Sequence, residues 1–137
     1  MKYPHIRKVE WVPAIHMYGA IAHGDVIKPP AGVPWTSVPI EGYATVEGSD
    51  STQTGTRLWT TTVRLRLCPG AQTGRFGQVV GCYRLTDVSG QRWILGKYGR
   101  PYPRTENGLQ LAAPTDPASR SLTITWVAPW GLLREIN

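Results

Sequence analysis

The feature that most constrains this chain is a run of alternating side chains between Arg57 and Leu67. One face of the run carries the mainly apolar set Trp59, Thr61, Val63, Leu65 and Leu67, and the other carries Thr60, Thr62, Arg64 and Arg66. A period of two residues, with β-branched and aromatic side chains, is typical of a strand that buries one face. We therefore predict a half-buried strand whose arginines face water or a partner.

A β-hairpin is predicted just downstream. A strand from Gln78 to Thr86 is followed by Asp87–Gly90, in which Asp opens and Gly closes a turn, and then by a strand from Gln91 to Tyr98. Short turns of this composition between two extended segments are characteristic of hairpins. Val79, Tyr83 and Leu85 are expected on one face of the first strand.

Other strand candidates complete an all-β pattern. Residues 121–127 alternate, with Leu122, Ile124 and Trp126 expected on the core side. Weaker candidates at 15–22 and 38–47 are separated by a proline-rich stretch at 28–34, and prolines confine the chain to edges and connections. Short strands without intervening helices predict a single all-β domain over residues 1–137, either a β-sandwich or a partly open β-barrel with long loops.

Two segments stand apart from this pattern. Residues 69–77 contain three glycines and no apolar periodicity, which predicts a long flexible loop. The tail at 129–137 is apolar and could form a short helix or a strand. It is expected either to dock on a neighbouring molecule or to pack back on its own domain.

Charge is unevenly distributed along the chain. The segment from Arg57 to Arg104 contains nine basic residues and one acid, Asp87, and so carries +8, which leaves −2 for the rest of a chain whose net charge is +6. A basic centre with a mildly acidic remainder suits an anionic partner or head-to-tail contact between copies of the chain.

No motif points to catalysis, a cofactor or a metal, and we expect none of the three. His5, His16, His23 and Asp25 do not form a set of metal ligands, and the chain lacks a Gly-x-Ser-x-Gly motif. Cys68 and Cys82 have no Cys-x-x-Cys spacing, and we expect two reduced thiols. If their flanking strands formed a hairpin, a disulfide would be geometrically feasible. The sequence also has no run of about 18 apolar residues that would span a membrane.

The strongest chemical signal is the interleaving of cations and aromatic residues between Gln91 and Arg104. Single-stranded nucleic acid is bound by such combinations, in which aromatic rings stack on bases and cations neutralise phosphates. Nucleic-acid binding by a β-barrel module is therefore the alternative function, although the glycine-aromatic signature of an RNA-recognition motif is absent. The candidate partner-binding residues over the whole chain are Arg64, Arg66, Arg75, Phe76, Arg92, Lys97, Tyr98, Arg100, Tyr102, Arg104 and Trp130.

The segment 83–96, continued by Arg100-Pro101-Tyr102-Pro103, resembles small proteins encoded in prophages of gut bacteria. The shared pattern is a strand, an Asp-to-Gly turn, a strand ending in Leu-Gly and a Pro-aromatic-Pro loop, over about 20 of the 137 residues. The resemblance implies a virion or assembly component at the head-to-tail junction or in the tail. Its partners would be copies of itself or other phage proteins. It would lie in the cytoplasm of the host bacterium or in the virion.

Overall fold

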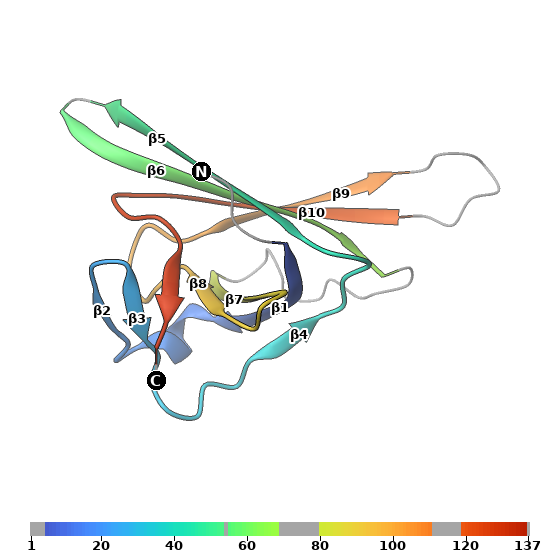
Figure 1. Cartoon of the computed structure of the whole chain (residues 1–137), viewed down its shortest axis with the longest axis horizontal. Helices are drawn as coiled ribbons and strands as arrows, with labels where there is room; N and C mark the ends of the chain where they lie inside the picture. Colours follow the sequence, from blue (N-terminus) through green and yellow to red (C-terminus); the bar gives the residue numbers. More distant parts are fainter. Residues whose placement is uncertain (1–4, 54, 69–79, 111–118, 137) are drawn as a thin grey trace.

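Two β-sheets make up the protein (Figure 1). The computed structural model describes residues 5–53, 55–68, 80–110 and 119–136, which form eleven strands and one short 3-10 helix. Within these residues the two sheets lie face to face and neither closes into a barrel. The predicted all-β, two-layer fold is confirmed.

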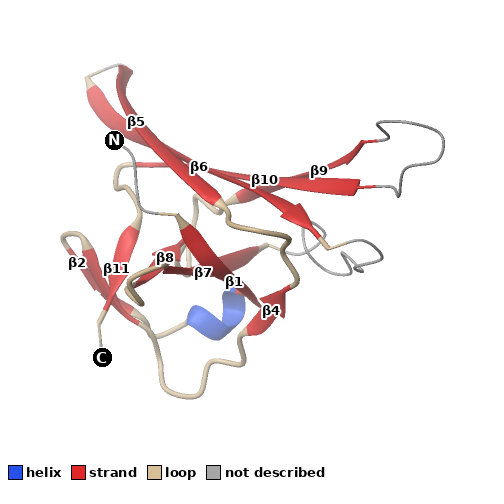
Figure 2. Ribbon diagram, turned by 45° about the vertical axis from the view of Figure 1, so that its right-hand side comes forward, coloured by secondary structure: helices blue, strands red, loops and turns tan. Residues whose placement is uncertain are grey.

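The larger sheet has seven strands. Every neighbouring pair in it is antiparallel except β3 and β11, which run parallel. In spatial order the strands are β2 (Ile21–His23), β3 (Val26–Lys28), β11 (Leu133–Glu135), β8 (Arg92–Leu95), β7 (Gly81–Asp87), β1 (Ile6–Pro13) and β4 (Thr36–Val38). Figure 2 shows the 3-10 helix η1 (Ala14–Met17) on the side of this sheet that faces away from the second sheet.

The smaller sheet has four long antiparallel strands. Their spatial order is β5 (Thr45–Gln53), β6 (Thr56–Leu67), β10 (Ser119–Ala128) and β9 (Arg104–Gln110). The strand predicted from alternation is β6, which buries Thr61, Val63, Leu65 and Leu67. Arg64 and Arg66 are exposed on its other face, as expected. The alternating segment near the C-terminus is β10, where Leu122, Ile124 and Trp126 are fully buried.

The predicted hairpin is formed by β7 and β8, and its turn is held by Asp87. One carboxylate oxygen of Asp87 accepts hydrogen bonds from the backbone N–H of Ser89 at 2.9 Å and of Gln91 at 3.0 Å, and the other accepts one from the Trp93 indole at 3.1 Å. Burial by itself would raise the pKa of Asp87, but hydrogen bonds from Ser89, Trp93 and Gln91 bring it below its ordinary value. The turn therefore contains a stabilised buried carboxylate.

Several segments differ from the sequence predictions. The candidate strand at 15–22 is wrong for its first half, because the chain forms η1 after Pro13. In the candidate strand at 38–47, residues 39–44 lie outside the strands because Pro39 and Gly42, at a φ of 74°, interrupt extended pairing. Strands β1, β3 and β9 were not predicted. The register of β1 shifts between Ile6 and Lys8, and this irregularity breaks the alternation that would have revealed it.

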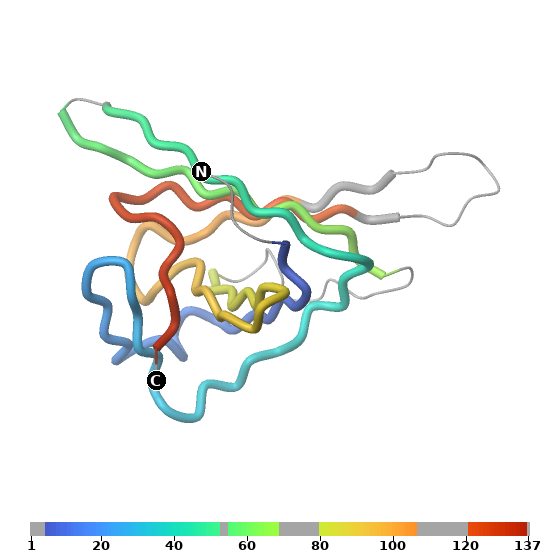
Figure 3. The backbone as a smooth tube through the Cα atoms, in the orientation of Figure 1, coloured from blue at the N-terminus to red at the C-terminus, as the bar shows by residue number. Residues whose placement is uncertain are grey.

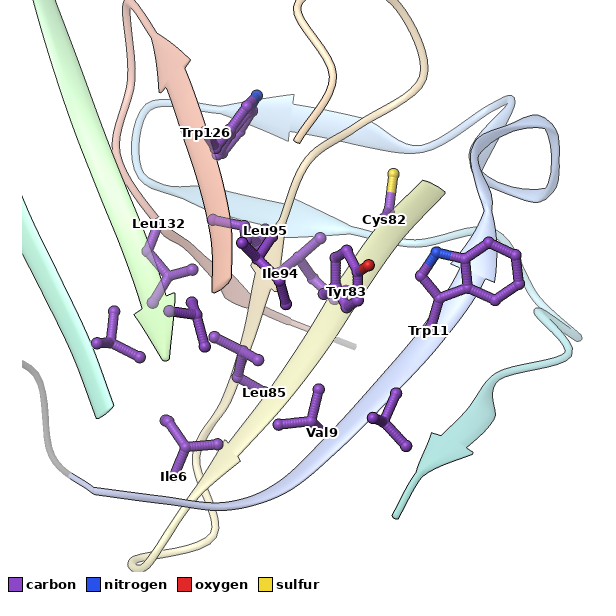
Figure 4. Close-up of a cluster of buried hydrophobic side chains, with 14 of the residues drawn as sticks. Ile6, Val9, Trp11, Cys82, Tyr83, Leu85, Ile94, Leu95, Trp126 and Leu132 are labelled. Atoms are coloured by element: carbon purple, nitrogen blue, oxygen red, sulfur yellow. The ribbon is translucent and has the colours of Figure 1, made fainter. Parts of the chain in front are cut away.

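One hydrophobic core fills the space between the sheets. Ile6, Val9 and Leu85 of the large sheet are fully buried in the same cluster as Ile124 and Trp126 of the small sheet (Figure 4). Burial raises the pKa values of both Cys82 and Tyr83 to about 12. The Tyr83 hydroxyl lies 2.6 Å from Thr105 Oγ1 on β9, so a polar contact also joins the two layers.

The C-terminal tail packs on its own domain. Strand β11 lies between β3 and β8, in the interior of the seven-stranded sheet (red in Figure 3). Leu132 and Leu133 are only 5% and 2% exposed. Of the two positions considered for this segment, docking on a neighbour is therefore wrong for residues 132–135, because their backbone and side chains are already used within the fold.

Candidate functional site

Three of the predicted partner-binding residues share one surface. Arg64, Arg66 and Arg104 are exposed on the face of the four-stranded sheet that points away from the core. Cross-strand partners on this face are hydroxyl residues, with Thr123 opposite Arg64 and Thr125 opposite Arg104. The surface is therefore flat and polar, and the described residues add no aromatic ring to it.

The cations of the 91–104 segment are not aligned with its aromatic rings. Arg92 pairs with Glu135 at 3.5 Å, and the Lys97 ammonium lies 3.9 Å from the centroid of the Trp130 ring. Trp130 in turn packs edge-on against the buried Trp126, with 5.8 Å between ring centroids. These contacts are internal to the domain, so Lys97 and Trp130 stabilise the fold where β11 begins.

The other candidates in this segment lie apart. Tyr98 is 44% exposed and contacts Tyr18 edge-on at a centroid distance of 5.1 Å. The Tyr102 hydroxyl accepts a hydrogen bond from the Gly99 backbone N–H at 3.2 Å, while Arg100 is exposed. The segment thus supplies no continuous strip of rings and cations. Arg75, Phe76 and the predicted flexible loop at 69–77 lie outside the described residues.

A cluster of buried ionic side chains crosses the centre of the seven-stranded sheet. Arg84 of β7 donates two hydrogen bonds of 2.9 Å to the carboxylate of Glu10 on β1. It also lies 3.5 Å from Glu135 of β11 and stacks over the Trp35 ring at 4.8 Å. Burial opposes the charge of Arg84, but its contacts with Glu10 and Glu135 give a net rise in its pKa. Sequence reasoning missed this cluster because its members come from three distant segments.

A hollow of about 420 Å³ lies beside this cluster, beneath the proline-rich loop. Its walls include Pro29, Pro30 and Trp35, with Arg84 and Glu135 at its polar side. Both carboxylates of the cluster are held by guanidinium groups, and the residues that line the hollow include no Ser, Thr, Cys or His. The ionic cluster therefore joins β1, β7 and β11 through side-chain contacts.

In the folded chain, many basic residues of the 57–104 segment lie next to acidic residues from other parts of the sequence. Five of the nine basic residues between 57 and 104 form ion pairs with acids outside that segment. These five are Arg57, Arg64, Arg84, Arg92 and Arg104, and their partners are Asp50, Glu47, Glu10, Glu135 and Glu106. The basic segment is therefore largely neutralised within the chain, which weakens the electrostatic argument for an anionic partner.

The outer half of the β5–β6 hairpin is a long exposed element of the four-stranded sheet. From Glu47 to Thr52 and from Thr56 to Thr60, none of the described side chains is buried, and Figure 1 shows the two strands extending past the seven-stranded sheet. Leu58 and Trp59 lie on this overhang and are only half-buried. Adjacent residues of a strand face opposite ways, so the Leu58-Trp59 pair was a sequence signal that one large apolar side chain would lie outside the core.

The described residues give no sign of a bound metal or a disulfide. They hold no group of three or more His, Cys, Asp or Glu side chains placed to ligate an ion. Cys68 directly follows β6 of the four-stranded sheet and Cys82 lies in β7 of the seven-stranded sheet, so they are not cross-strand neighbours. The Cys68 thiol donates to the Ile40 carbonyl oxygen at 3.3 Å. None of the helices in this part of the chain could cross a membrane.

Comparison with known protein families, with curated proteins and with solved structures finds no match for the chain.

Proposed function

We propose that this chain is a non-enzymatic assembly protein that acts through protein–protein contacts, with copies of itself as the first partner. The observation that carries the proposal is the overhanging half of the β5–β6 hairpin. An isolated two-stranded hairpin is marginally stable in water, and a stable one requires further strands or a packing surface. Partner surfaces on the two faces of the overhang would cover Leu58 on one side and Trp59 on the other, which the chain itself leaves half-exposed.

The edges of the four-stranded sheet support self-association. Strands β5 and β9 are its two edges, and three successive antiparallel pairings make them run in opposite directions. Two copies placed side by side in the same orientation would therefore bring β9 of one antiparallel to β5 of the next. Such a head-to-tail contact repeats around an axis and closes into a ring when the rotation allows it.

The setting we propose is a phage or prophage particle, at the head-to-tail connection or in the tail. The support for this setting is the resemblance of the 83–103 segment to prophage proteins, combined with a fold that presents two open sheet edges. The alternative of single-stranded nucleic-acid binding has less support. The exposed arginines of the four-stranded sheet lack neighbouring rings, and Arg92 and Lys97 have internal partners.

Sedimentation and native mass measurement of the full chain, over a range of concentrations, test the proposal. We expect discrete oligomers that dissociate when Leu58 and Trp59 are both changed to Ser. The fold should survive because neither residue belongs to the buried core. Val88→Ser is the matched control, since Val88 is 54% exposed but lies in the turn after β7, on the other sheet. A chain that stays monomeric at every concentration, or oligomers that the double variant leaves intact, would refute the proposal.

A further inference from the structure

The two edges of the seven-stranded sheet are protected differently. Strand β4, at one edge, has Pro34 shortly before it and Pro39 directly after it. Proline at an edge removes a backbone donor and discourages pairing with another chain. Strand β2, at the other edge, consists of Ile21, Ala22 and His23 and has neither a proline nor a permanently charged residue. All three of its residues are exposed.

A hollow lined by apolar and aromatic residues adjoins this unprotected edge. It measures about 320 Å³, and its fully buried lining residues are Met17 and Ile27. Tyr18, 71% exposed, and Tyr98, 44% exposed, also line it and contact each other edge-on. Exposed tyrosines around an apolar hollow are typical of surfaces that bind protein chains.

The backbone of β2 is oriented to receive a further strand. A two-residue turn, Gly24 and Asp25, joins β2 to β3, and His23 and Val26 flank it. In such a hairpin the flanking pair exchanges hydrogen bonds and the next pair does not. Ala22 belongs to that next pair, so its N–H and C=O face the open edge. The same residue lines the hollow.

Charge distinguishes between the possible occupants of this edge. Lys97 lines the hollow, Lys28 lies opposite Ile21 in β3, and Arg134 lies opposite Val26 in the next strand. The acids beside them are Asp25 in the turn and Glu135, which is already paired with Arg84 and Arg92, so Lys97, Lys28, Arg134 and Asp25 sum to +2. A symmetric contact between two β2 strands would bring these cations together, whereas an acidic segment would be attracted.

From these observations we propose that the β2 edge binds an extended, acidic segment of a partner protein by strand addition. An apolar side chain of that segment would enter the hollow lined by Tyr18 and Tyr98, and the acidic residues that alternate with it would lie on the other face, beside Lys28. Backbone pairing at Ala22 supplies affinity, while the hollow and Lys28 select the sequence. This inference does not depend on the self-association proposed for the four-stranded sheet.

Amide chemical-shift mapping of the full chain tests the site with two blocked heptapeptides, one alternating Val with Asp and the other alternating Val with Lys. We expect the acidic peptide to shift the amides of Ile21, Ala22 and Tyr98. It should bind at least about tenfold more tightly than the basic one at low salt. Lys28→Glu should abolish that preference, whereas Arg66→Glu, the same charge change on the other sheet, should leave it intact.

A second variant tests the backbone contact. Ala22→Pro removes the outward N–H at an edge position where proline is compatible with a sheet, so it should abolish peptide binding without unfolding the chain. Equal binding of both peptides, no shifts at the β2 edge, or an unaffected Lys28→Glu variant would overturn the proposal. A dimer of the chain alone that Ala22→Pro dissociates would also overturn it, because the occupant would then be a second copy.

Discussion

Replacing Arg84 with Met tests the view that the buried ionic cluster ties the seven-stranded sheet together. The side chains of Glu10 and Glu135 are only 10% and 8% exposed, and Arg84 lies within 2.9 Å and 3.5 Å of them. Met retains much of the aliphatic stem but leaves both carboxylates short of a partner. Removing one member of a buried ion pair costs about 3–5 kcal/mol of unfolding free energy. Because Arg92 still contacts Glu135 and Lys8 lies 4.0 Å from Glu10, we expect the lower end, about 3 kcal/mol.

Urea unfolding followed by tryptophan fluorescence measures this loss. With a denaturant slope of about 1–3 kcal/mol per molar, the midpoint should fall by roughly 1–2 M. Arg64→Met is the matched control, because it breaks an ion pair with Glu47 that lies on the surface. The side chains of Arg64 and Glu47 are 56% and 62% exposed. An exposed pair contributes less than about 1 kcal/mol, so its midpoint should hardly move.

Neutralising the two glutamates separates an electrostatic loss of stability from a packing defect in the Arg84→Met variant. Without Arg84, the carboxylates of Glu10 and Glu135 are left buried and short of a partner, and Glu10→Gln with Glu135→Gln removes both charges. The deficit caused by Arg84→Met should therefore shrink when both glutamates are glutamine. A deficit that is the same in both backgrounds, or no larger than that of Arg64→Met, would refute the role assigned to the cluster.

Three further predictions concern the core and the C-terminus. Gly81→Ala should lower the unfolding free energy by about 1–3 kcal/mol, because its Cβ would collide with the Trp11 indole and the Val12 carbonyl oxygen; an unchanged thermal midpoint would contradict this. Stability should fall between pH 9 and 12, because burial raises the pKa of Cys82 from 9.0 and that of Tyr83 from 10.0 to about 12 in each case. Urea midpoints measured across this pH range check the prediction. Tyr83→Phe should make the midpoint fall less steeply with pH, and a variant with the same pH dependence as the natural chain would exclude Tyr83 as a contributor. Deleting residues 132–137 should abolish the near-ultraviolet circular dichroism of the folded chain, because β3 and β8 lose the strand between them; a truncated chain with the full signal would contradict that role for β11.

Local patterns were sufficient to predict the strands with one buried face and the tight turn. The alternation in β6 and β10 records which side of the small sheet packs on the core, and the Asp87–Gly90 turn joins β7 to β8 through contacts within a few residues. The all-β class follows from such periodicity because a two-residue repeat cannot be accommodated on one face of a helix.

Tertiary structure decided the rest, because the deciding contacts join residues far apart in the chain. Arg84 meets Glu10 and Glu135 only after β1 and β11 enter the same sheet, and no local pattern encodes that pairing. The irregular register of β1 hides its two-residue repeat. Burial on both faces of β7 removes the alternation of apolar and polar residues from which a half-buried strand is predicted. The sequence by itself therefore determined the strand-forming segments. The long-range packing determined which charges are neutralised internally and which edges, β2, β5 and β9, stay open for a partner.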